Sequence, residues 1–327
     1  MTDNTGMNGA RIKKLFSEVK RPEYFFWGAF VLVCLLFLFP ESGVLAEPEV
    51  QIAAVRRGGR ANSFAEVSLE AKAAAVLDAR TGRILFERNA REVLPLASLT
   101  KIMTAFAALR HAPETTLIPI SDESLREEGD TGLISGDEWL LRDLLKITLL
   151  ESSNDGAHAV AETVGALAGG FSSREDGRTF FISEMNHAAA ALSLRTLSFR
   201  NETGLDMSQT VSGGYGSARD AAELFSISLA AHPKIFEPTR FDAAVLAGNG
   251  RGGIDARNTN QETGKFPLLI ASKTGYTDLA GGNLALAFDA GFNRPIIIVV
   301  LGSSYEGRFA DAEKLVWATL AYLAQAR

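Results

Sequence analysis

The sequence predicts an α+β fold, in which an antiparallel sheet is flanked by helices and packs against a mainly helical lobe. Three observations predict it. Short β-rich runs lie near residues 73–87 and again at 266–304, helical patterns fill the region between them, and one more helical pattern follows the last run. A sheet assembled from both chain ends and covered by helices is an α+β architecture.

The strand predictions come from apolar runs bounded by turn residues. Residues 73–87 contain two such runs separated by a polar turn with Thr81 and Gly82, which is typical of a β-hairpin. Three further runs, at 266–275, 283–291 and 295–304, predict successive antiparallel strands. The amphipathic pattern over 306–326 predicts a long helix after them.

The helical lobe is predicted from apolar residues at helical spacing. Over 98–110 this spacing predicts a helix with one face in the core, and Lys101 starts that face. The polar segment SSND interrupts the next helical pattern, and such a break is well placed to present side chains. The other predicted helices are at about 137–150, 156–169, 180–192 and 218–231.

The first 46 residues form a separate segment. Five basic residues within positions 11–21 precede an uncharged apolar run from Tyr24 to Phe39, which is a membrane-targeting pattern. The length of the run fits both a short retained anchor and a long signal peptide cleaved after Ala46, so both stay open. Either way, residues beyond 46 are expected outside the cytoplasmic membrane, with 47–67 as a tether and 68–327 as the folded domain.

Composition argues against several partners. Beyond Ala46 the chain has 28 basic and 35 acidic residues, which argues against a nucleic-acid partner. The single cysteine, Cys34, lies in the apolar run, so the exported part has no disulfide. The histidines show no zinc-ligand spacing, so neither a metal nor a cofactor is expected. Each is expected to be a surface or packing residue: His111, His158, His187 and His232.

Ser98 and Lys101 stand three residues apart in ASLTK, at the predicted start of a helix. Taken alone, they fit a helix N-cap and a solvated first-turn lysine. However, residues i and i+3 share a helix face, the helix dipole favours negative charge near the serine, and a lysine among apolar neighbours loses its proton more readily. A neutral amine beside a hydroxyl is a general base, so the pair predicts a nucleophile with its base.

Two further motifs accompany this pair. SSN at 152–154 and KTG at 273–275 complete the set Ser-x-x-Lys, Ser-x-Asn and Lys-Thr-Gly in that order, which resembles the signature of penicillin-recognising serine acyl-transferases. Nearly all of residues 72–325 resembles the low-molecular-mass D-alanyl-D-alanine carboxypeptidases. The segments that carry this resemblance include LPLASLTKIMTA, LRDLLKITLLESSNDGA, GLDMSQTVSGGYGSARDAAELF, ARNTN and SKTGYTDLAGG.

The resemblance implies the fold shared by DD-peptidases and serine β-lactamases, with 68–327 as the catalytic domain and the site between sheet and lobe. It implies that Ser98 attacks the carbonyl of the penultimate D-Ala and that Lys101 takes its proton. Ser152 would relay a proton between Lys101 and the leaving amine, and Asn154 would hold the substrate amide or Lys101.

The KTG segment is implied to bind the substrate. Lys273 and Thr274 would receive its terminal carboxylate, and Gly275 would let the strand lie close to the substrate backbone. The oxyanion would lie between the backbone amides of Ser98 and Tyr276. The implied partners are peptidoglycan stem peptides, β-lactams as covalent inhibitors, and the membrane through the N-terminal segment. The expected location is the outer face of the bacterial cytoplasmic membrane, or the periplasm after cleavage.

Departures and alternatives remain at this point. Ser153 stands where many relatives carry glycine, and Ala271 and Ser272 precede Lys273 in place of a glycine-containing lead. A D,D-endopeptidase would use the same residues, and a sensory β-lactam-binding module would keep them without turnover. A serine β-lactamase needs an additional carboxylate in a Glu-x-x-x-Asn arrangement, which the sequence lacks.

Overall fold

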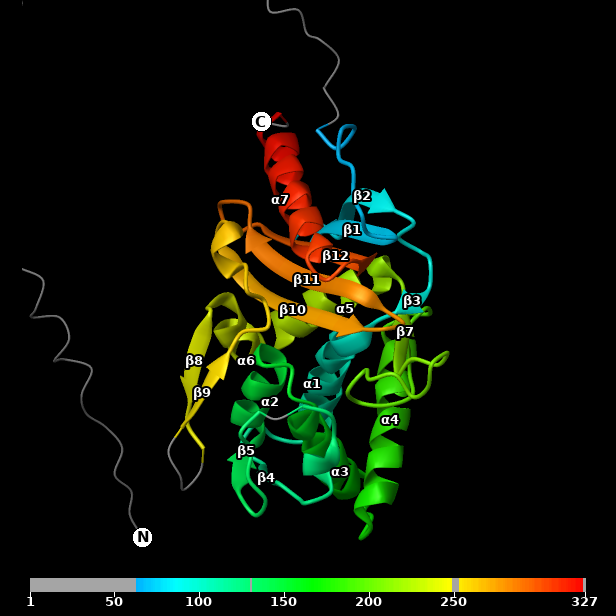
Figure 1. The fold of residues 1–327 in the computed structure, drawn as a ribbon, viewed down its shortest axis with the longest axis vertical. Coiled ribbons are helices and arrows are strands. Elements are labelled where there is room, and N and C mark those ends of the chain that lie inside the picture. Colours follow the sequence, from blue (N-terminus) through cyan, green and yellow to red (C-terminus); the bar gives the residue numbers. More distant parts are fainter. Residues whose placement is uncertain (1–62, 130, 249–252, 326–327) are drawn as a thin grey trace, which may run out of the picture. The chain divides into compact units, whose positions relative to one another are not determined.

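The structure, a computed structural model, describes residues 63–129, 131–248 and 253–325. Its centre is a five-stranded sheet in the order β10-β11-β12-β1-β2, and every neighbouring pair is antiparallel (Figure 1). The strands are β1 (Ala73–Asp78), β2 (Arg83–Arg88), β10 (Leu269–Thr277), β11 (Gly281–Asp289) and β12 (Pro295–Ser303). Because β1 pairs with β12, the sheet joins both ends of the described chain, which confirms the predicted α+β class.

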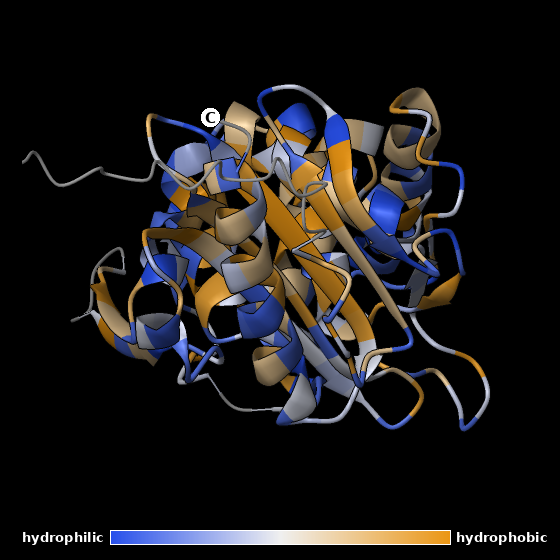
Figure 2. Cartoon of the chain, turned by 90° about the horizontal axis from the view of Figure 1, so that it is seen from above, coloured by the Kyte–Doolittle hydropathy of each residue, from blue (hydrophilic) through white to orange (hydrophobic). Residues whose placement is uncertain are grey.

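Helices cover both faces of this sheet. On β1, Val76 belongs to the cluster beneath α7 (Gly307–Gln325), while Ala75 belongs to the cluster shared with α5 (Ala218–Ala231) on the other face. Side chains alternate between the faces of a strand, so a strand buried on both faces is apolar without interruption. This explains the run at 296–301 and the hydrophobic colour of the central strands in Figure 2.

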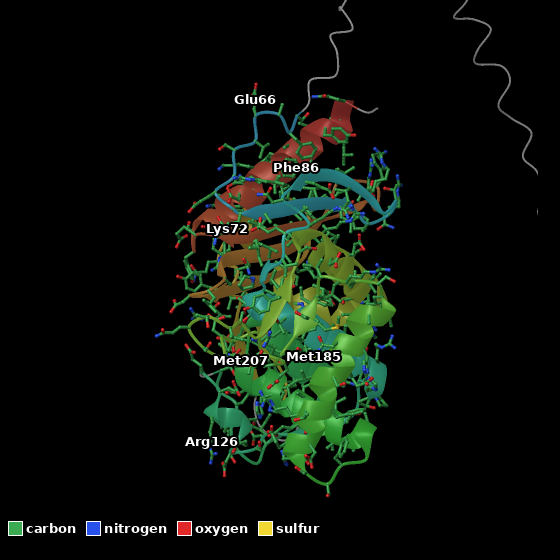
Figure 3. The ribbon with its side chains drawn as sticks, turned by 90° about the vertical axis from the view of Figure 1, so that its right-hand side faces the viewer. Glu66, Lys72, Phe86, Arg126, Met185 and Met207 are labelled. Carbon is green, nitrogen blue, oxygen red and sulfur yellow. The ribbon has the colours of Figure 1, made fainter. Side chains whose placement is uncertain are left out.

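The helical lobe is built around α1 (Thr100–His111). Every residue of α1 from Thr100 to Ala108 is buried, so the prediction of a single core face was wrong. Small side chains let α2, α3, α4 and α5 all pack against it, and Thr104 lies within 4.0 Å of the sulfur of Met185, which Figure 3 labels inside the lobe. The surrounding helices are α2 (Leu141–Leu150), α3 (Asn154–Gly169), α4 (Arg174–Ala191) and α6 (Pro233–Phe236).

Several element boundaries differ from the prediction. The helix predicted from about 137 begins at Leu141, because Glu138–Leu140 form β5 and pair with β4 (Leu117–Pro119). Helix α4 begins six residues before the predicted start, where the Ser173 hydroxyl accepts from the amide of Asp176 and caps it.

Elements of two to four residues were not predicted, because they are too short to show a period, and several of the strands among them pair with distant segments. They also include β3 (Leu94–Pro95), β6 (Ser198–Phe199), β7 (Gly214–Gly216), β8 (Ala243–Leu246), β9 (Ile254–Arg257) and the 3-10 turns η1 (Ala97–Leu99), η2 (Ser124–Arg126), η3 (Glu237–Arg240) and η4 (Thr263–Lys265).

The predicted targeting segment, residues 1–46, and most of the predicted tether lie outside the described residues. Within the range predicted as tether, Phe64 is buried and its ring lies 5.2 Å from that of Phe86 and 5.6 Å from that of Tyr322 (Figure 3 labels Phe86). The packed structure therefore includes residues before 68. Within the described ranges, no helix is both long enough and apolar enough to cross a membrane.

Helices α3 and α4 cross at two glycines. A methyl group at Gly165 would overlap the carbonyl oxygen of Gly177, and one at Gly177 would lie 2.5 Å from the amide nitrogen of Ala166. Both obstacles are helix backbone, which cannot move away unless the helices separate. The close crossing therefore requires glycine at both positions.

We expect Gly165→Ala to lower the free energy of unfolding by about 1–3 kcal/mol, the usual effect of overpacking a core, despite the higher helix propensity of alanine. Urea denaturation monitored by circular dichroism measures this loss. Gly264→Ala is the matched control, because no heavy atom lies within 4 Å of the added methyl group. Equal stability of the two variants would contradict the tight crossing.

Candidate active site

The turn that carries Ser98 is held in an uncommon backbone conformation. Ser98 lies in η1, directly before α1, and Ala97 has φ 49°. A non-glycine residue in this left-handed region is strained and persists only where its surroundings impose it. Here Gly204 imposes it, because a side chain at Gly204 would overlap the carbonyl oxygen of Ala97. The serine is thus presented by a closely packed turn.

Lys101 is fully buried one helical turn further on. Its Nζ lies 3.1 Å from Ser98 Oγ, 2.6 Å from Asn154 Oδ1 and 2.7 Å from the carbonyl oxygen of Thr203. Burial lowers the pKa of Lys101 to about 7, against the opposing effect of two carboxylates, Glu202 and Glu127. At neutral pH the amine is therefore available in both protonation states.

The polar break between α2 and α3 brings Ser152 and Asn154 to the same place. Ser152 has φ 65°, so this second serine is also held in the left-handed region. Ser153 caps α3 by accepting from the amide of Gly156 at 2.9 Å, and its hydroxyl lies 2.8 Å from that of Thr131. The serine that replaces the expected glycine at 153 is therefore the N-cap of α3.

Strand β10, at one edge of the sheet, supplies Lys273 and Thr274. The buried Lys273 donates to Ser152 Oγ at 2.9 Å and to the carbonyl oxygen of Thr274 at 2.8 Å. Burial lowers the pKa of Lys273 well below its usual value, and the nearby charges of Lys101 and Arg308 lower it further. The three sequence motifs therefore meet through two hydrogen-bonded pairs, Lys101 with Asn154 and Lys273 with Ser152.

Gly275 allows β10 to approach the turn that carries Ser98. A methyl group there would lie 3.0 Å from the carbonyl oxygen of Leu96 and 3.1 Å from both the amide nitrogen of Ser98 and the Cβ of Ala97. That this glycine lets the strand lie close to a substrate backbone stays a prediction; the structure adds that it makes room for η1. The next residue, Tyr276, is thereby placed beside Ser98.

A cavity of about 220 Å³ opens at this junction of sheet and lobe. Five predicted site residues line it: Ser98, Ser152, Thr274, Gly275 and Tyr276. The other three, Lys101, Asn154 and Lys273, are not in its wall: Lys101 and Lys273 contact it through Ser98 and Ser152, and Asn154 is linked to it through Lys101.

Sequence reasoning missed the remaining wall of the cavity, which is formed by Thr259, Gln261, Tyr305 and Arg308. Arg308 donates to the carbonyl oxygen of Gly275 at 3.0 Å and lies 4.2 Å from the ring centre of Tyr305. Thr259 was available only as part of ARNTN, without a role. For Arg308 there was no local signal, because it begins a helix whose pattern indicates only packing.

Ser272, the other departure, explains how Thr259 reaches the cavity. Its hydroxyl donates to the carbonyl oxygen of Thr239 at 3.0 Å and accepts from Asn260 Nδ2 at 3.0 Å. These bonds tie β10 to the segment around Thr259, whose hydroxyl lies 2.6 Å from that of Thr274. A serine at 272 therefore supports this wall of the site.

Comparisons with known proteins place this geometry in a family. Residues 60–305 match the family model described as D-alanyl-D-alanine carboxypeptidase, peptidase S11. The chain is 31% identical over 258 residues to D-alanyl-D-alanine carboxypeptidase DacF of Bacillus subtilis, covering 77% of this chain and 62% of that protein. It therefore spans about three fifths of the length of that relative.

Two further proteins are similar over most of the chain. A D-alanyl-D-alanine endopeptidase of Pseudomonas aeruginosa is 29% identical over 256 residues, which is 76% of each protein. The solved structure of penicillin-binding protein D2 from Listeria monocytogenes, in its ampicillin-bound form, superposes with a TM-score of 0.61 at 29% identity and covers 77% of this chain and 98% of that one.

These matches extend over the sheet, the helical lobe and the three motifs that meet at the cavity. Because the family model alone spans well over half of the sequence, the chain belongs to the D-alanyl-D-alanine carboxypeptidase family, peptidase S11.

Proposed function

We propose that this chain is a serine D,D-carboxypeptidase, a hydrolase that removes the terminal D-Ala from peptidoglycan stem peptides through an acyl-enzyme on Ser98. The observation that carries the proposal is the distance of 3.1 Å between Ser98 Oγ and the fully buried Nζ of Lys101. A neutral amine held at this distance from a hydroxyl is a general base for nucleophilic attack.

In the proposed reaction, Ser98 Oγ bonds to the carbonyl carbon of the penultimate D-Ala while Lys101 takes the hydroxyl proton. The oxyanion lies between the backbone amides of Ser98 and Tyr276. Ser152, hydrogen-bonded to Lys273, passes its proton to the leaving nitrogen and takes the proton that Lys101 received from Ser98, so Lys101 is neutral again as the C–N bond breaks and D-Ala is released. Water then hydrolyses the ester, which releases the shortened peptide and restores Ser98.

The cavity wall suggests how the substrate carboxylate is bound. Thr274 and Arg308 line the cavity, whereas Lys273 lies behind Ser152, so we assign the direct contacts to Thr274 and Arg308. A guanidinium is well suited to a carboxylate because it offers parallel donors. Lys273 then attracts the substrate carboxylate electrostatically without contacting it, since a bound carboxylate favours the ammonium form of this lysine.

Strand β10 also offers a backbone to the substrate. It lies at the sheet edge, and an extended peptide can add to such an edge through main-chain hydrogen bonds. In this arrangement the stem peptide runs along β10 past Thr274 and Gly275 and brings its last peptide bond to Ser98. β-Lactams are covalent inhibitors at the same serine in this proposal.

We place the enzyme outside the bacterial cytoplasm, where its substrate is assembled. The basic and apolar N-terminal segment, residues 1–46, would deliver it there as a retained membrane anchor or as a signal peptide cleaved after Ala46. Mass spectrometry of the mature N-terminus distinguishes these two forms.

We expect Ser98→Ala to abolish covalent labelling by a fluorescent penicillin and release of D-Ala from a pentapeptide, because no other group replaces the attacking oxygen. Labelling is read on a denaturing gel. Ser172→Ala is the control, since that serine is exposed and distant from the motifs in sequence, and it should label like the parent. Persistent labelling of the Ser98 variant would overturn the assignment.

We expect the rate of acylation by penicillin to rise with pH through a midpoint near 7, because the amine of Lys101 must lose its proton to act as a base. Lys101→Arg keeps the charge but does not deprotonate, so we expect a loss of roughly 100- to 10,000-fold across the whole pH range. Stopped-flow labelling measures both. A flat profile in the parent enzyme would contradict the role of Lys101.

Substrate choice tests the assignment of Arg308. In the parent enzyme we expect free D-Ala from a pentapeptide and little cleavage of a cross-linked dimer. In Arg308→Gln we expect KM for the pentapeptide to rise roughly 10- to 100-fold, because the substitution removes a charged donor. The same variant should hardly change KM for a substrate whose C-terminus is amidated. Monomers released mainly from the dimer would instead identify an endopeptidase, the activity named for the Pseudomonas aeruginosa relative. Thermal melting verifies that each variant is folded.

A further inference from the structure

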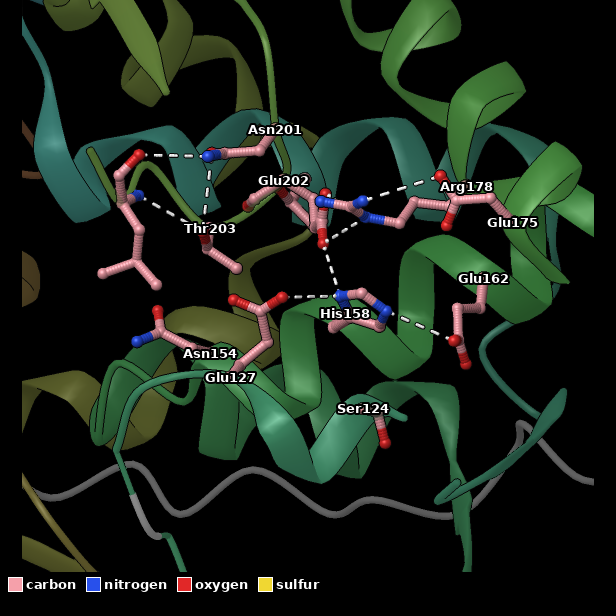
Figure 4. A network of polar contacts seen from close by, with 12 residues as sticks. Ser124, Glu127, Asn154, His158, Glu162, Glu175, Arg178, Asn201, Glu202 and Thr203 are labelled. Atoms are coloured by element: carbon pink, nitrogen blue, oxygen red, sulfur yellow. Dashed lines mark hydrogen bonds and ion pairs between the residues drawn. The ribbon is translucent and has the colours of Figure 1, made fainter. Parts of the chain in front are cut away.

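A buried histidine surrounded by carboxylates lies beneath the proposed active site (Figure 4). His158, on α3, is 5% exposed, and its Nδ1 lies 3.0 Å from carboxylate oxygens of both Glu127 and Glu202. Its other ring nitrogen, Nε2, lies 3.2 Å from Glu162 Oε1. The sequence indicated only a surface or packing residue at His158. Glu127 and Glu202 are far from it in the sequence, and Glu162, one helical turn after it, carries no distinguishing pattern.

The charges of this cluster balance only if the imidazole is protonated. Arginines of α4 complete the cluster, with Arg178 Nε at 3.0 and 3.2 Å from the two oxygens of Glu202 and Arg174 at 3.2 Å from Glu162. Within the enclosed cluster, three carboxylates thus face two guanidiniums and one imidazole; a fourth carboxylate, Glu175, lies 3.9 Å from Arg178 but is 73% exposed, so solvent screens its charge. An imidazolium makes the formal charges equal, which matters because Glu202 and Glu162 are almost completely buried.

Glu127, His158 and Glu202 are each linked to Lys101, either through one of its hydrogen-bond acceptors or through a group that holds such an acceptor. Glu202 precedes Thr203, whose carbonyl oxygen accepts from Lys101 Nζ. Glu127 precedes Glu128, whose carbonyl oxygen accepts from Asn154 Nδ2 at 2.6 Å. His158 lies one helical turn after Asn154, so it anchors the same end of α3.

We propose that His158 is a protonated positioning residue, which joins Glu127 and Glu202 beneath the site, fixes Asn154 and Thr203 as acceptors of Lys101 Nζ, and offsets the negative charge that these carboxylates direct at the amine. This inference rests on the proposed role of Lys101 as the base.

The electrostatic part of the proposal follows from the groups around each amine or imidazole. Burial alone would lower the pKa of His158, but the contacts with Glu127, Glu162 and Glu202 raise it to about 11. Glu202 and Glu127 raise the pKa of Lys101 against the effect of burial, and on the other side Lys273 of β10 has its own pKa lowered by burial and by the charge of Lys101. Without the imidazolium, only Arg174 and Arg178 would offset these carboxylates, and Glu127 would face no cation at ion-pair distance among the described residues of the cluster.

A metal ion is a weaker explanation of the same cluster. The ligand atoms of Glu127, His158 and Glu202 lie within 4.8 Å of one another. However, Arg178 already occupies both oxygens of Glu202, and a divalent cation beside a neutral imidazole would leave the cluster with a net positive charge. A single proton on the imidazole makes the formal charge of the cluster zero, so we assign a protonated His158 and no metal ion to this position.

The proposal predicts opposite effects for two substitutions. We expect H158Q, which removes a positive charge, to move the midpoint of the pH profile of penicillin acylation upward by on the order of one pH unit. E127Q removes a negative charge and should move the midpoint downward. Glu127 is only partly buried, so this variant is the safer one for folding. A purely structural role would lower the rates without moving the midpoints in opposite directions.

H187Q is the matched control, because His187 is exposed and contacts only Glu184 among the described ion pairs; its midpoint should equal that of the parent. Nitrogen NMR of the unsubstituted enzyme tests the charge without any variant, since a histidine of ordinary pKa is neutral at pH 9 whereas His158 should remain an imidazolium. A neutral His158 at pH 9, unchanged midpoints in both variants, or one equivalent of bound metal per chain would overturn the proposal. If instead the parent shows no acylation dependent on Ser98, the proposed function itself fails.

Discussion

The site depends on one constraint, which is that an amine is buried without a carboxylate in direct contact. Lys101 is fully enclosed, and its three hydrogen-bond partners are the Ser98 hydroxyl, an amide oxygen and a backbone carbonyl. Neutral acceptors can hold either protonation state, whereas a directly paired carboxylate would keep the ammonium form. The carboxylates of the cluster act from a greater distance, through the segments that carry Asn154 and Thr203. This arrangement keeps the lysine near its titration point.

The fold provides this constraint by bringing three distant segments together. Helix α1 is buried over most of its length, so Lys101 has no route to solvent through its own helix. The break between α2 and α3 supplies one acceptor, and the loop after β6 supplies another. Strand β10 closes the remaining side, because β1 and β12 unite the two ends of the described chain in one sheet. The contacts that assemble the fold are therefore the same contacts that enclose Lys101.

Much of the fold could be predicted from the sequence, because long elements have periods. The hairpin at β1 and β2, helix α5 and the last three strands were all recognised from apolar spacing. Short pairs such as β4 with β5 could not be, since three residues show no period. The three motifs identified Ser98, Lys101 and Lys273 because they are compact in sequence. Arg308 and His158 could not be found in this way, because their significance comes only from groups that the fold places beside them.

The two glycines beside the Ser98 turn have a consequence for turnover. Gly204 and Gly275 let backbone from the lobe and from the sheet press against the same few atoms, so the nucleophile is already aligned in the free protein. Ligand binding then costs little conformational entropy, because the protein is already ordered. The cavity beside Ser98 is small, and it does not need to widen for a D-Ala residue, whose side chain is a methyl group. The same close backbone contacts leave this cavity little freedom to widen, so the acyl group proposed for Ser98 would meet fixed walls whatever its size.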